Sequence, residues 1–257
     1  MGNACCTEQK GTKIDALEHA EKRPPKTMPN GATYVGEWLG TQRHGYGEQT
    51  WADGARYVGQ WHQDKAQGKG RFQHCDGDVY DGDWLDDKAH GHGVYTHANG
   101  STYDGQWAAD KQDGEGVETW PDGARYQGQY KGGHKNGRGE FVWSDGSSYI
   151  GDFIDNDLNG QGLYKWFDGR QYSGQWVGNQ MHGKGRFTWT DGRVYEGEYK
   201  EDMKDGYGVF SWSDGRKYEG QWKAGKQHGK GTYTSKGNPK EGIWEDGKRI
   251  KWITPES

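Results

Sequence analysis

The sequence predicts an all-β protein, in which short hairpins follow one another to form one extended, single-layer antiparallel sheet. Three observations predict this fold class. The chain has 46 glycines among its 257 residues. The spacing from Tyr34 to Tyr57 to Tyr80 recurs unchanged through most of the chain. Within each unit, aromatic residues and glycines alternate with polar residues, which is the period of a β-strand.

The composition excludes several other classes of protein. Leu, Ile, Val and Phe together make up roughly 10% of the chain, a content that is typical of disordered chains. The 14 Trp, the 16 Tyr and a net charge of only −5 contradict disorder, because so many large aromatic residues favour burial. Six prolines are too few for collagen. The mildly acidic net charge argues against a nucleic-acid partner, because nucleic-acid-binding domains are usually basic.

The first residues, Met1-Gly2-Asn3-Ala4-Cys5-Cys6-Thr7, resemble a lipidation motif. Removal of Met1 would expose Gly2 for myristoylation, and Cys5 and Cys6 are suited to palmitoylation, although Cys6 stands where the simple pattern has Ser or Thr. A single myristoyl chain binds membranes with a constant on the order of 10⁴ M⁻¹, so durable anchoring requires the cysteine acyl chains as well. No stretch of the sequence is apolar and long enough to span a bilayer. We therefore expect attachment at the cytoplasmic face of a plasma, cortical or ciliary membrane.

Residues 1–29 form a leader before the repeats. Within it, residues 12–23 are expected to form a short helix, with Thr12 as its cap and Pro24-Pro25 at its end. Its apolar content is low, and we interpret it as a spacer between the lipid anchor and the repeats.

Each repeat begins its first predicted strand at a tyrosine. A glycine follows at the second position after it and an aromatic residue at the fourth, while polar residues such as Glu37 and Gln60 alternate with them on the other face. Nine equally spaced tyrosines define nine units: Tyr34, Tyr57, Tyr80, Tyr103, Tyr126, Tyr149, Tyr172, Tyr195 and Tyr218.

A second strand follows in each unit. It contains two glycines and then alternating aromatic residues, as in Gly183, Gly185, Phe187 and Trp189. Asn-Gly or Asp-Gly pairs such as Asp53-Gly54 end the second strands and predict type I′ turns. The other connection is predicted just before the paired glycines, at residues that mostly tolerate the left-handed region: His44, Gln67, His90, Asp113, Asn136, Asn159, His182, Asp205 and His228.

The array is predicted to occupy residues 30–244. A tenth, degenerate unit ends it with Gly242 and Trp244, and we interpret this unit as a C-terminal cap. Residues 245–257 form a tail whose basic and apolar segment, residues 248–253, is expected to cover the last edge of the sheet.

Nine copies of the pattern YxGxWxxxxxxGxGxxxxxDGxx closely resemble MORN repeats (membrane occupation and recognition nexus) over roughly four-fifths of the chain. The resemblance implies one β-hairpin per repeat, stacked into an extended, twisted antiparallel sheet. It also implies a scaffold or adaptor, often near membranes or in cortical and ciliary structures.

One face of the predicted sheet is rich in aromatic residues, and an aromatic face that is only partly covered is a candidate interaction surface. The rings can equally bury one another as a thin core, and the two interpretations are compatible. The candidate interaction residues are Tyr57, Trp61, Tyr80, Trp84, Tyr103, Trp107, Tyr126, Tyr172, Trp176, Tyr195, Tyr218 and Trp222.

No motif predicts catalysis, a cofactor or a metal site. His74, Cys75, His90, His92 and His97 are close in sequence and include metal-ligand types, but each occupies a position that other repeats fill with turn or strand residues. The many Gly-x-Gly pairs lack the following helix that a phosphate-binding loop requires. We therefore expect that the protein is not an enzyme.

On the polar face, lysines and arginines such as Lys69 and Lys184 stand opposite carboxylates such as Asp83 and Glu198. Cross-strand pairing explains them, and binding of phospholipid headgroups is the alternative.

These observations favour a non-enzymatic, membrane-tethered scaffold that organises protein partners, with a homodimer as a secondary expectation. The alternative is a structural subunit of a cilium, a flagellum or the cortical cytoskeleton. A weaker alternative, from family analogy alone, is a phospholipid-binding regulatory subunit of a lipid kinase.

Overall fold

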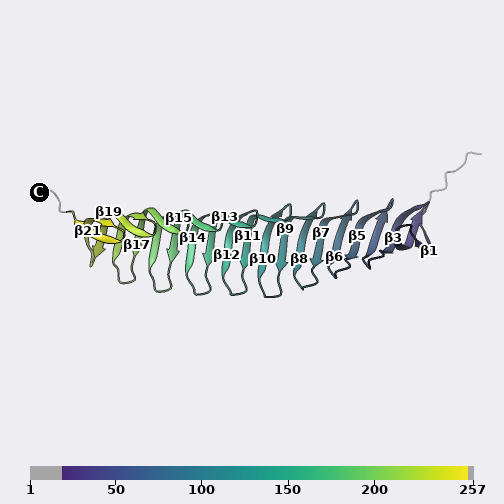
Figure 1. Ribbon diagram of the computed structural model, residues 1–257, viewed down its shortest axis with the longest axis horizontal. Helices are drawn as coiled ribbons and strands as arrows, with labels where there is room; N and C mark the ends of the chain where they lie inside the picture. The colour runs from purple at the N-terminus through teal and green to yellow at the C-terminus, as the bar shows by residue number, and fades with distance from the viewer. Residues whose placement is uncertain (1–18, 254–257) are drawn as a thin grey trace, which may run out of the picture.

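The computed structural model describes residues 19–253, which form one antiparallel sheet of 21 strands. Every strand pairs with the next one in the chain, and the first and last strands each have a single neighbour, so the sheet is open. Figure 1 shows the resulting elongated ladder, with the N-terminal and C-terminal strands at opposite ends. The prediction of an all-β, single-layer meander is confirmed.

The strands are β1 (Glu21–Thr27), β2 (Thr33–Leu39), β3 (Gln42–Thr50), β4 (Arg56–His62), β5 (Lys65–Gln73), β6 (Val79–Leu85), β7 (Lys88–Thr96), β8 (Thr102–Ala108), β9 (Lys111–Thr119), β10 (Arg125–Lys131), β11 (His134–Val142), β12 (Ser148–Ile154), β13 (Asp157–Lys165), β14 (Gln171–Val177), β15 (Gln180–Thr188), β16 (Val194–Lys200), β17 (Met203–Ser211), β18 (Lys217–Lys223), β19 (Lys226–Ser235), β20 (Asn238–Glu245) and β21 (Lys248–Trp252).

The sequence predicts tight type I′ turns at the Asp-Gly pairs, but the structure has longer loops there and places the tight turns at the other connection of each repeat. The tight turn that requires positive φ at both central residues joins β4 to β5, where Gln63 has φ 48° and Asp64 has φ 70°. At Asp53-Gly54 only the glycine is left-handed, with φ 91°. The Asp53 carboxylate there accepts a hydrogen bond from Ala55 N–H at 3.0 Å. This Asx turn stabilises a longer loop, so the type I′ prediction for Asp-Gly was wrong.

The prediction of turns at His44, Gln67, His90 and their equivalents was also wrong, since these residues lie inside strands. They come before a glycine with positive φ, such as Gly68 at 68°. Between β4 and β5 the register passes from Gly59 opposite Gly70 to Trp61 opposite Ala66, which is a β-bulge. The Gln60 side chain fills the bulge and accepts a hydrogen bond from Lys69 N–H at 2.8 Å.

The N-terminal helix prediction for residues 12–23 was wrong where it can be compared, because Glu21–Arg23 belong to strand β1. Residues 12–18 lie outside the described residues. The register of β1 on β2 shifts between Arg23 and Lys26, across Pro24 and Pro25. Proline has no N–H to donate, and an edge strand tolerates this. No helix among residues 19–253 is long and apolar enough to cross a membrane.

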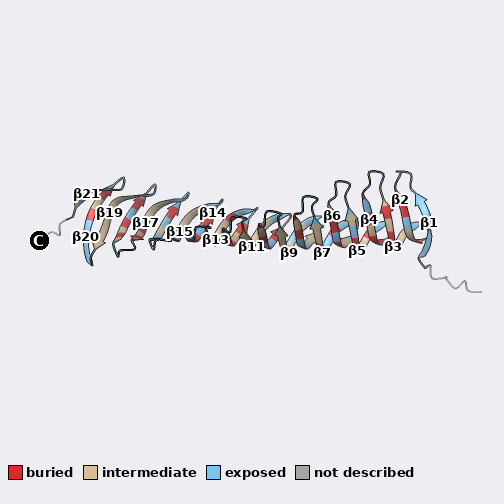
Figure 2. Cartoon of the chain, turned by 90° about the horizontal axis from the view of Figure 1, so that it is seen from below, coloured by how far each residue is buried: buried red, intermediate tan, exposed pale blue. Residues whose placement is uncertain are grey.

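The C-terminal tail pairs on the last edge of the sheet, where β21 lies antiparallel to β20. The sheet therefore extends beyond residues 30–244 at both ends. Buried positions alternate with exposed ones along strands such as β14, while β1 is exposed along its length (Figure 2). The core of this thin molecule lies on one face of the sheet, and it consists mainly of tyrosine and tryptophan rings.

Candidate binding groove

The floor of the aromatic face is made by tyrosines that lie across paired glycines. A methyl group at Gly70 would come 2.5 Å from Tyr57 Cζ, and one at Gly59 would come 2.5 Å from Gly70 Cα. Only glycine leaves room for the ring at these two positions. The Tyr57 hydroxyl donates a hydrogen bond to Gln60 O at 2.9 Å, so the buried ring has its polar atom satisfied. Burial raises the pKa of Tyr57, and this tyrosine stays neutral at physiological pH.

Tryptophans connect one repeat to the next. The Tyr57 ring meets Trp61 of its own repeat edge to face at 5.0 Å, and it meets Trp84 of the following repeat in the same way at 5.1 Å. Trp84 Nε1–H donates a hydrogen bond to Gly70 O at 2.8 Å. Since the repeats share this geometry, the rings form a continuous ladder, as repeat proteins require of their neighbour interfaces.

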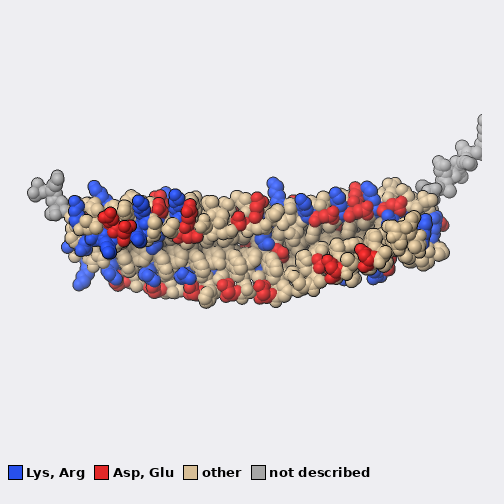
Figure 3. Space-filling view, viewed as in Figure 1, with Lys and Arg blue, Asp and Glu red and all other residues tan. Residues whose placement is uncertain are grey.

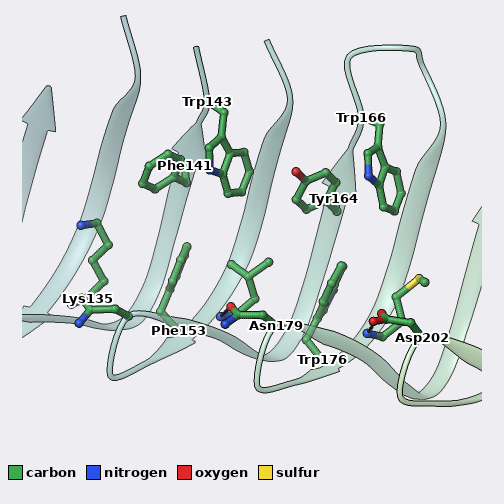
Figure 4. Close-up of a pocket in the computed structure, with 12 residues that line it drawn as sticks. Lys135, Phe141, Trp143, Phe153, Tyr164, Trp166, Trp176, Asn179 and Asp202 are labelled. Carbon is green, nitrogen blue, oxygen red and sulfur yellow. Dashed lines mark hydrogen bonds between the residues drawn. The ribbon is translucent and has the colours of Figure 1, made fainter. Parts of the chain in front are cut away.

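A second row of aromatic rings comes from the odd-numbered strands and the loops that follow them. Figure 4 shows Phe141 and Trp143, then Tyr164 and Trp166, on one side of the groove, with Phe153 and Trp176 on the other. The second-row rings follow one another closely, with centroids 4.6 Å apart for Phe141–Trp143 and 5.1 Å apart for Trp143–Tyr164. These four rings are only partly buried, and they form part of the accessible wall of the groove.

We call the groove the hollow between rings such as Phe153 and Trp176 on one side and second-row rings such as Phe141 and Trp143 on the other. Figure 3 shows it as a long hollow with charged side chains along both margins. A cavity of about 580 Å³ in its middle is lined by residues from Lys135 to Asp202. A second cavity, of about 560 Å³, lies nearer the N-terminus between Arg43 and Asp110.

Three cations reach into the groove from equivalent positions in their repeats. Arg43 lies 4.1 Å from the Trp61 ring centroid and is paired with Asp64 at 3.1 Å. Lys135 Nζ lies 5.1 Å from the Trp120 ring and 2.7 Å from Glu118.

Lys204 is the third cation, and within residues 19–253 it has no carboxylate partner like those of Arg43 and Lys135. Four rings surround its Nζ, those of Trp189, Tyr195, Phe210 and Trp222, at 4.6 to 5.1 Å. Burial, assisted by repulsion from Arg193, lowers the pKa of Lys204 to about 8.

The structure places the predicted interaction residues at different depths. All seven of the predicted tyrosines, namely Tyr57, Tyr80, Tyr103, Tyr126, Tyr172, Tyr195 and Tyr218, are at most 2% exposed. Trp61, Trp176 and Trp222 are also buried, while Trp84 and Trp107 are partly exposed. The groove wall that a ligand can reach consists largely of second-row rings such as Trp143 and Trp166, which the candidate set omitted. The recurrence of these rings at fixed distances after most of the repeat tyrosines was the available signal.

Gly2, Cys5 and Cys6 lie outside the described residues. Within residues 19–253, no three His, Cys, Asp or Glu side chains are grouped so as to hold a metal ion. Of the histidines considered as ligands, His97 contacts Asp78 at 3.0 Å and His92 contacts Asp104 at 3.2 Å.

The opposite, polar face carries cross-strand ion pairs. Lys69 and Asp83 approach to 2.7 Å, and Arg186 and Glu196 to 3.4 Å. These pairs are exposed and individually contribute little to stability.

The fold and the groove define an open β-meander built from closely similar hairpin units. Nine segments match the MORN repeat family, at residues 34–56, 57–79, 80–102, 103–125, 126–148, 149–169, 172–192, 195–215 and 218–238. The chain belongs to the MORN repeat family, whose arrays are generally non-catalytic scaffolds that bind proteins or membranes.

Among curated proteins, none matches the chain. Among solved structures, the TCP domain of SAS-4 (dCPAP) of Drosophila melanogaster, in complex with a proline-rich motif of Ana2, has a TM-score of 0.38 and 13% identity, covering 76% of this chain and 99% of that domain. A mutant TCP10 domain of Danio rerio CPAP has a TM-score of 0.42 and 17% identity, covering 77% and 92%.

Proposed function

We propose that this protein is a non-enzymatic scaffold, tethered to the cytoplasmic face of a membrane, whose aromatic groove holds segments of partner proteins. The observation that carries the groove part of this proposal is the continuous second row of rings from Phe141 to Tyr233, most of them partly exposed. Exposed, contiguous apolar surface of this kind marks interaction sites in soluble proteins.

The tether part of the proposal depends on the sequence of the first residues. Gly2 is the proposed myristoyl acceptor, and acyl chains on Cys5 and Cys6 would supply the second anchor. Gly2→Ala, or the pair Cys5→Ser and Cys6→Ser, is expected to move the protein from the membrane pellet to the soluble fraction. Cys75→Ser is the matched control, because Cys75 is exposed but far from the motif in the sequence. Unchanged pelleting of the Gly2→Ala protein would refute the tether.

Partner binding is tested separately by proximity labelling in cells. Trp143→Ser with Trp166→Ser removes two wall rings, whereas Lys69→Ser with Lys184→Ser alters only the polar face. We expect the first pair to lose labelled protein partners that the wild-type chain and the second pair retain. Identical partner sets for all three proteins would exclude the groove as the binding surface. Loss with the polar-face pair alone would favour headgroup or partner binding on that face instead.

The alternative role, a structural subunit of a cilium or the cortical cytoskeleton, draws on the elongated open sheet, whose two edges are far apart (Figure 1). Detergent extraction separates the two roles. A lipid-tethered scaffold enters the detergent extract, whereas a subunit built into an assembly stays in the insoluble fraction.

A further inference from the structure

The four rings that surround Lys204 have counterparts of identical type six repeats earlier in the chain. Trp51, Tyr57, Phe72 and Trp84 occupy the positions of Trp189, Tyr195, Phe210 and Trp222. The position of Lys204 itself is occupied by Ala66. We call this earlier ring set, with Ala66 at its base, the Ala66 cage.

The two ring sets have nearly the same dimensions. Ring centroids are 5.5 Å apart for Trp51–Phe72 and 5.6 Å apart for Trp189–Phe210. The Phe72–Trp84 and Phe210–Trp222 separations are both 6.2 Å. Tyr57–Trp84 and Tyr195–Trp222 measure 5.1 and 5.2 Å. The space that the lysine side chain fills in one set is therefore left open in the other.

The open space belongs to the N-terminal cavity of about 560 Å³, which all four rings and Ala66 line. The next repeat enlarges it, because Ala89 stands at the equivalent position and lines the same cavity. A ligand can thus reach the rings from the groove.

The charges near the Ala66 cage favour a cation more than those near Lys204. Arg193 repels the Lys204 ammonium, and the equivalent position near the Ala66 cage holds the uncharged Ala55. Near Lys204 stands Gly225, and the equivalent position near the Ala66 cage holds Asp87. The Asp87 carboxylate lines the cavity and accepts a hydrogen bond from Ala66 N–H at 2.7 Å. Asp110 also lines the cavity. Arg43 lines it too, but its guanidinium is paired with the Asp64 carboxylate.

We propose that the Ala66 cage binds the ammonium group of a lysine side chain supplied by a partner protein. Aromatic faces attract cations, and the chain itself places a lysine in an equivalent ring set. Burial lowers the pKa of Lys204 in that set, whereas the Ala66 cage opens to the groove and has the Asp87 carboxylate in its lining. The Asp87 carboxylate balances the charge of the incoming ammonium. The inference rests on the proposed function, since it names one chemical feature of a partner segment that the groove would hold.

The test uses a defined probe on the full chain, Nα-acetyl-lysine methylamide, with its uncharged Nε-acetylated counterpart as the comparison. Binding is followed by the indole N–H resonances of Trp51 and Trp84. We expect saturable shifts with the charged probe and about tenfold weaker binding of the neutral one, as one desolvated cation–π contact implies. Equal binding of the two probes, or no binding of either, would overturn the proposal.

Two reciprocal variants locate the site. Ala66→Lys fills the cage from within and is expected to abolish the shifts at Trp51 and Trp84. Lys204→Ala empties the second cage, where Arg193 repels a cation and Gly225 stands in place of Asp87, so probe-dependent shifts at Trp189 and Trp222 are expected to be weaker than those at Trp51 and Trp84 in the wild type. If binding survives Ala66→Lys, the ammonium binds elsewhere and the assignment is wrong.

Asp87→Asn tests the charge with the least disturbance, because an amide oxygen can still accept from Ala66 N–H. It is expected to weaken binding of the charged probe severalfold and to leave binding of the neutral probe unchanged. Equal effects on the binding of both probes would show that the Asp87 charge does not contribute to the site. None of these measurements requires lipid or a natural partner, so a failed membrane or labelling experiment leaves their outcome unaffected.

Discussion

The ring of Tyr126 lies across Gly139 on the neighbouring strand, so close that a methyl group at Gly139 would come 2.6 Å from Tyr126 Cε2. Gly139→Ala must therefore displace a fully buried ring or spread β10 from β11. We expect the free energy of unfolding to fall by about 1–3 kcal/mol, the usual cost of overpacking. Urea denaturation followed by tryptophan fluorescence measures the change. Gln127→Ala, an exposed substitution on β10, is the control and should shift the midpoint little.

The bulge between β10 and β11 is stabilised by a side chain, and this provides a second prediction. Gln129 Oε1 accepts a hydrogen bond from Arg138 N–H at 3.0 Å. Gln129→Ala is expected to lower the free energy of unfolding by about 1 kcal/mol, because the bulge amide loses its acceptor. Gln129→Glu should be tolerated, since Glu37 performs the same task in the first repeat by accepting from Tyr46 N–H at 2.7 Å. If glutamate is as damaging as alanine, the hydrogen bond is not the cause.

Lys204 gives the protein a defined pH dependence. Its pKa is lowered from 10.5 to about 8 by burial among the rings. Between these values the unfolded chain holds a proton that the folded chain has released, so stability rises with pH from about 8 toward 10. Above pH 10 the trend reverses, because burial raises the pKa of Tyr34 and Tyr218 to about 12 and deprotonation favours the unfolded chain.

Lys204→Met removes this titration. We expect the variant to be more stable than the wild type at pH 7 by about 1–3 kcal/mol, with the gain disappearing as the pH approaches 10. Denaturation curves at pH 7, 8, 9 and 9.5 measure both effects. A constant difference between the two proteins over this range would contradict the lowered pKa.

Lys135 occupies the same repeat position as Lys204, but it has a carboxylate partner, so its replacement is expected to destabilise the protein. Its ammonium lies 2.7 Å from Glu118, and the two side chains are only 15% and 19% exposed. Lys135→Met leaves the Glu118 carboxylate without its cation, and we expect it to lower the free energy of unfolding by about 2 kcal/mol. Adding Glu118→Gln should restore part of the loss. A double-mutant cycle with no coupling would show that the two residues act independently.

The repeat spacing and alternation were sufficient to predict the meander, its strand order and the face on which the tyrosines lie. The predictions from spacing and alternation were wrong where the same residues are compatible with two local backbone conformations. Asp-Gly supports either a type I′ turn or a longer loop with one left-handed glycine. The choice depends on the Asp53 side chain, which bonds to Ala55 N–H. His44 was misplaced for a related reason, because a glycine with positive φ marks a bulge within a strand as readily as a turn.

The sequence by itself determined the sheet, because burying tyrosine rings on glycine is a local rule that each repeat obeys and nine repeats reinforce. Only the tertiary structure decided what the groove offers, because each cage combines residues from three successive repeats. Trp51, Ala66 and Trp84 are far apart in the chain, and the folding of neighbouring hairpins brings them around one cavity. The difference between a filled and an open cage is one side chain, Lys204 or Ala66, which has no significance until the rings around it are in place.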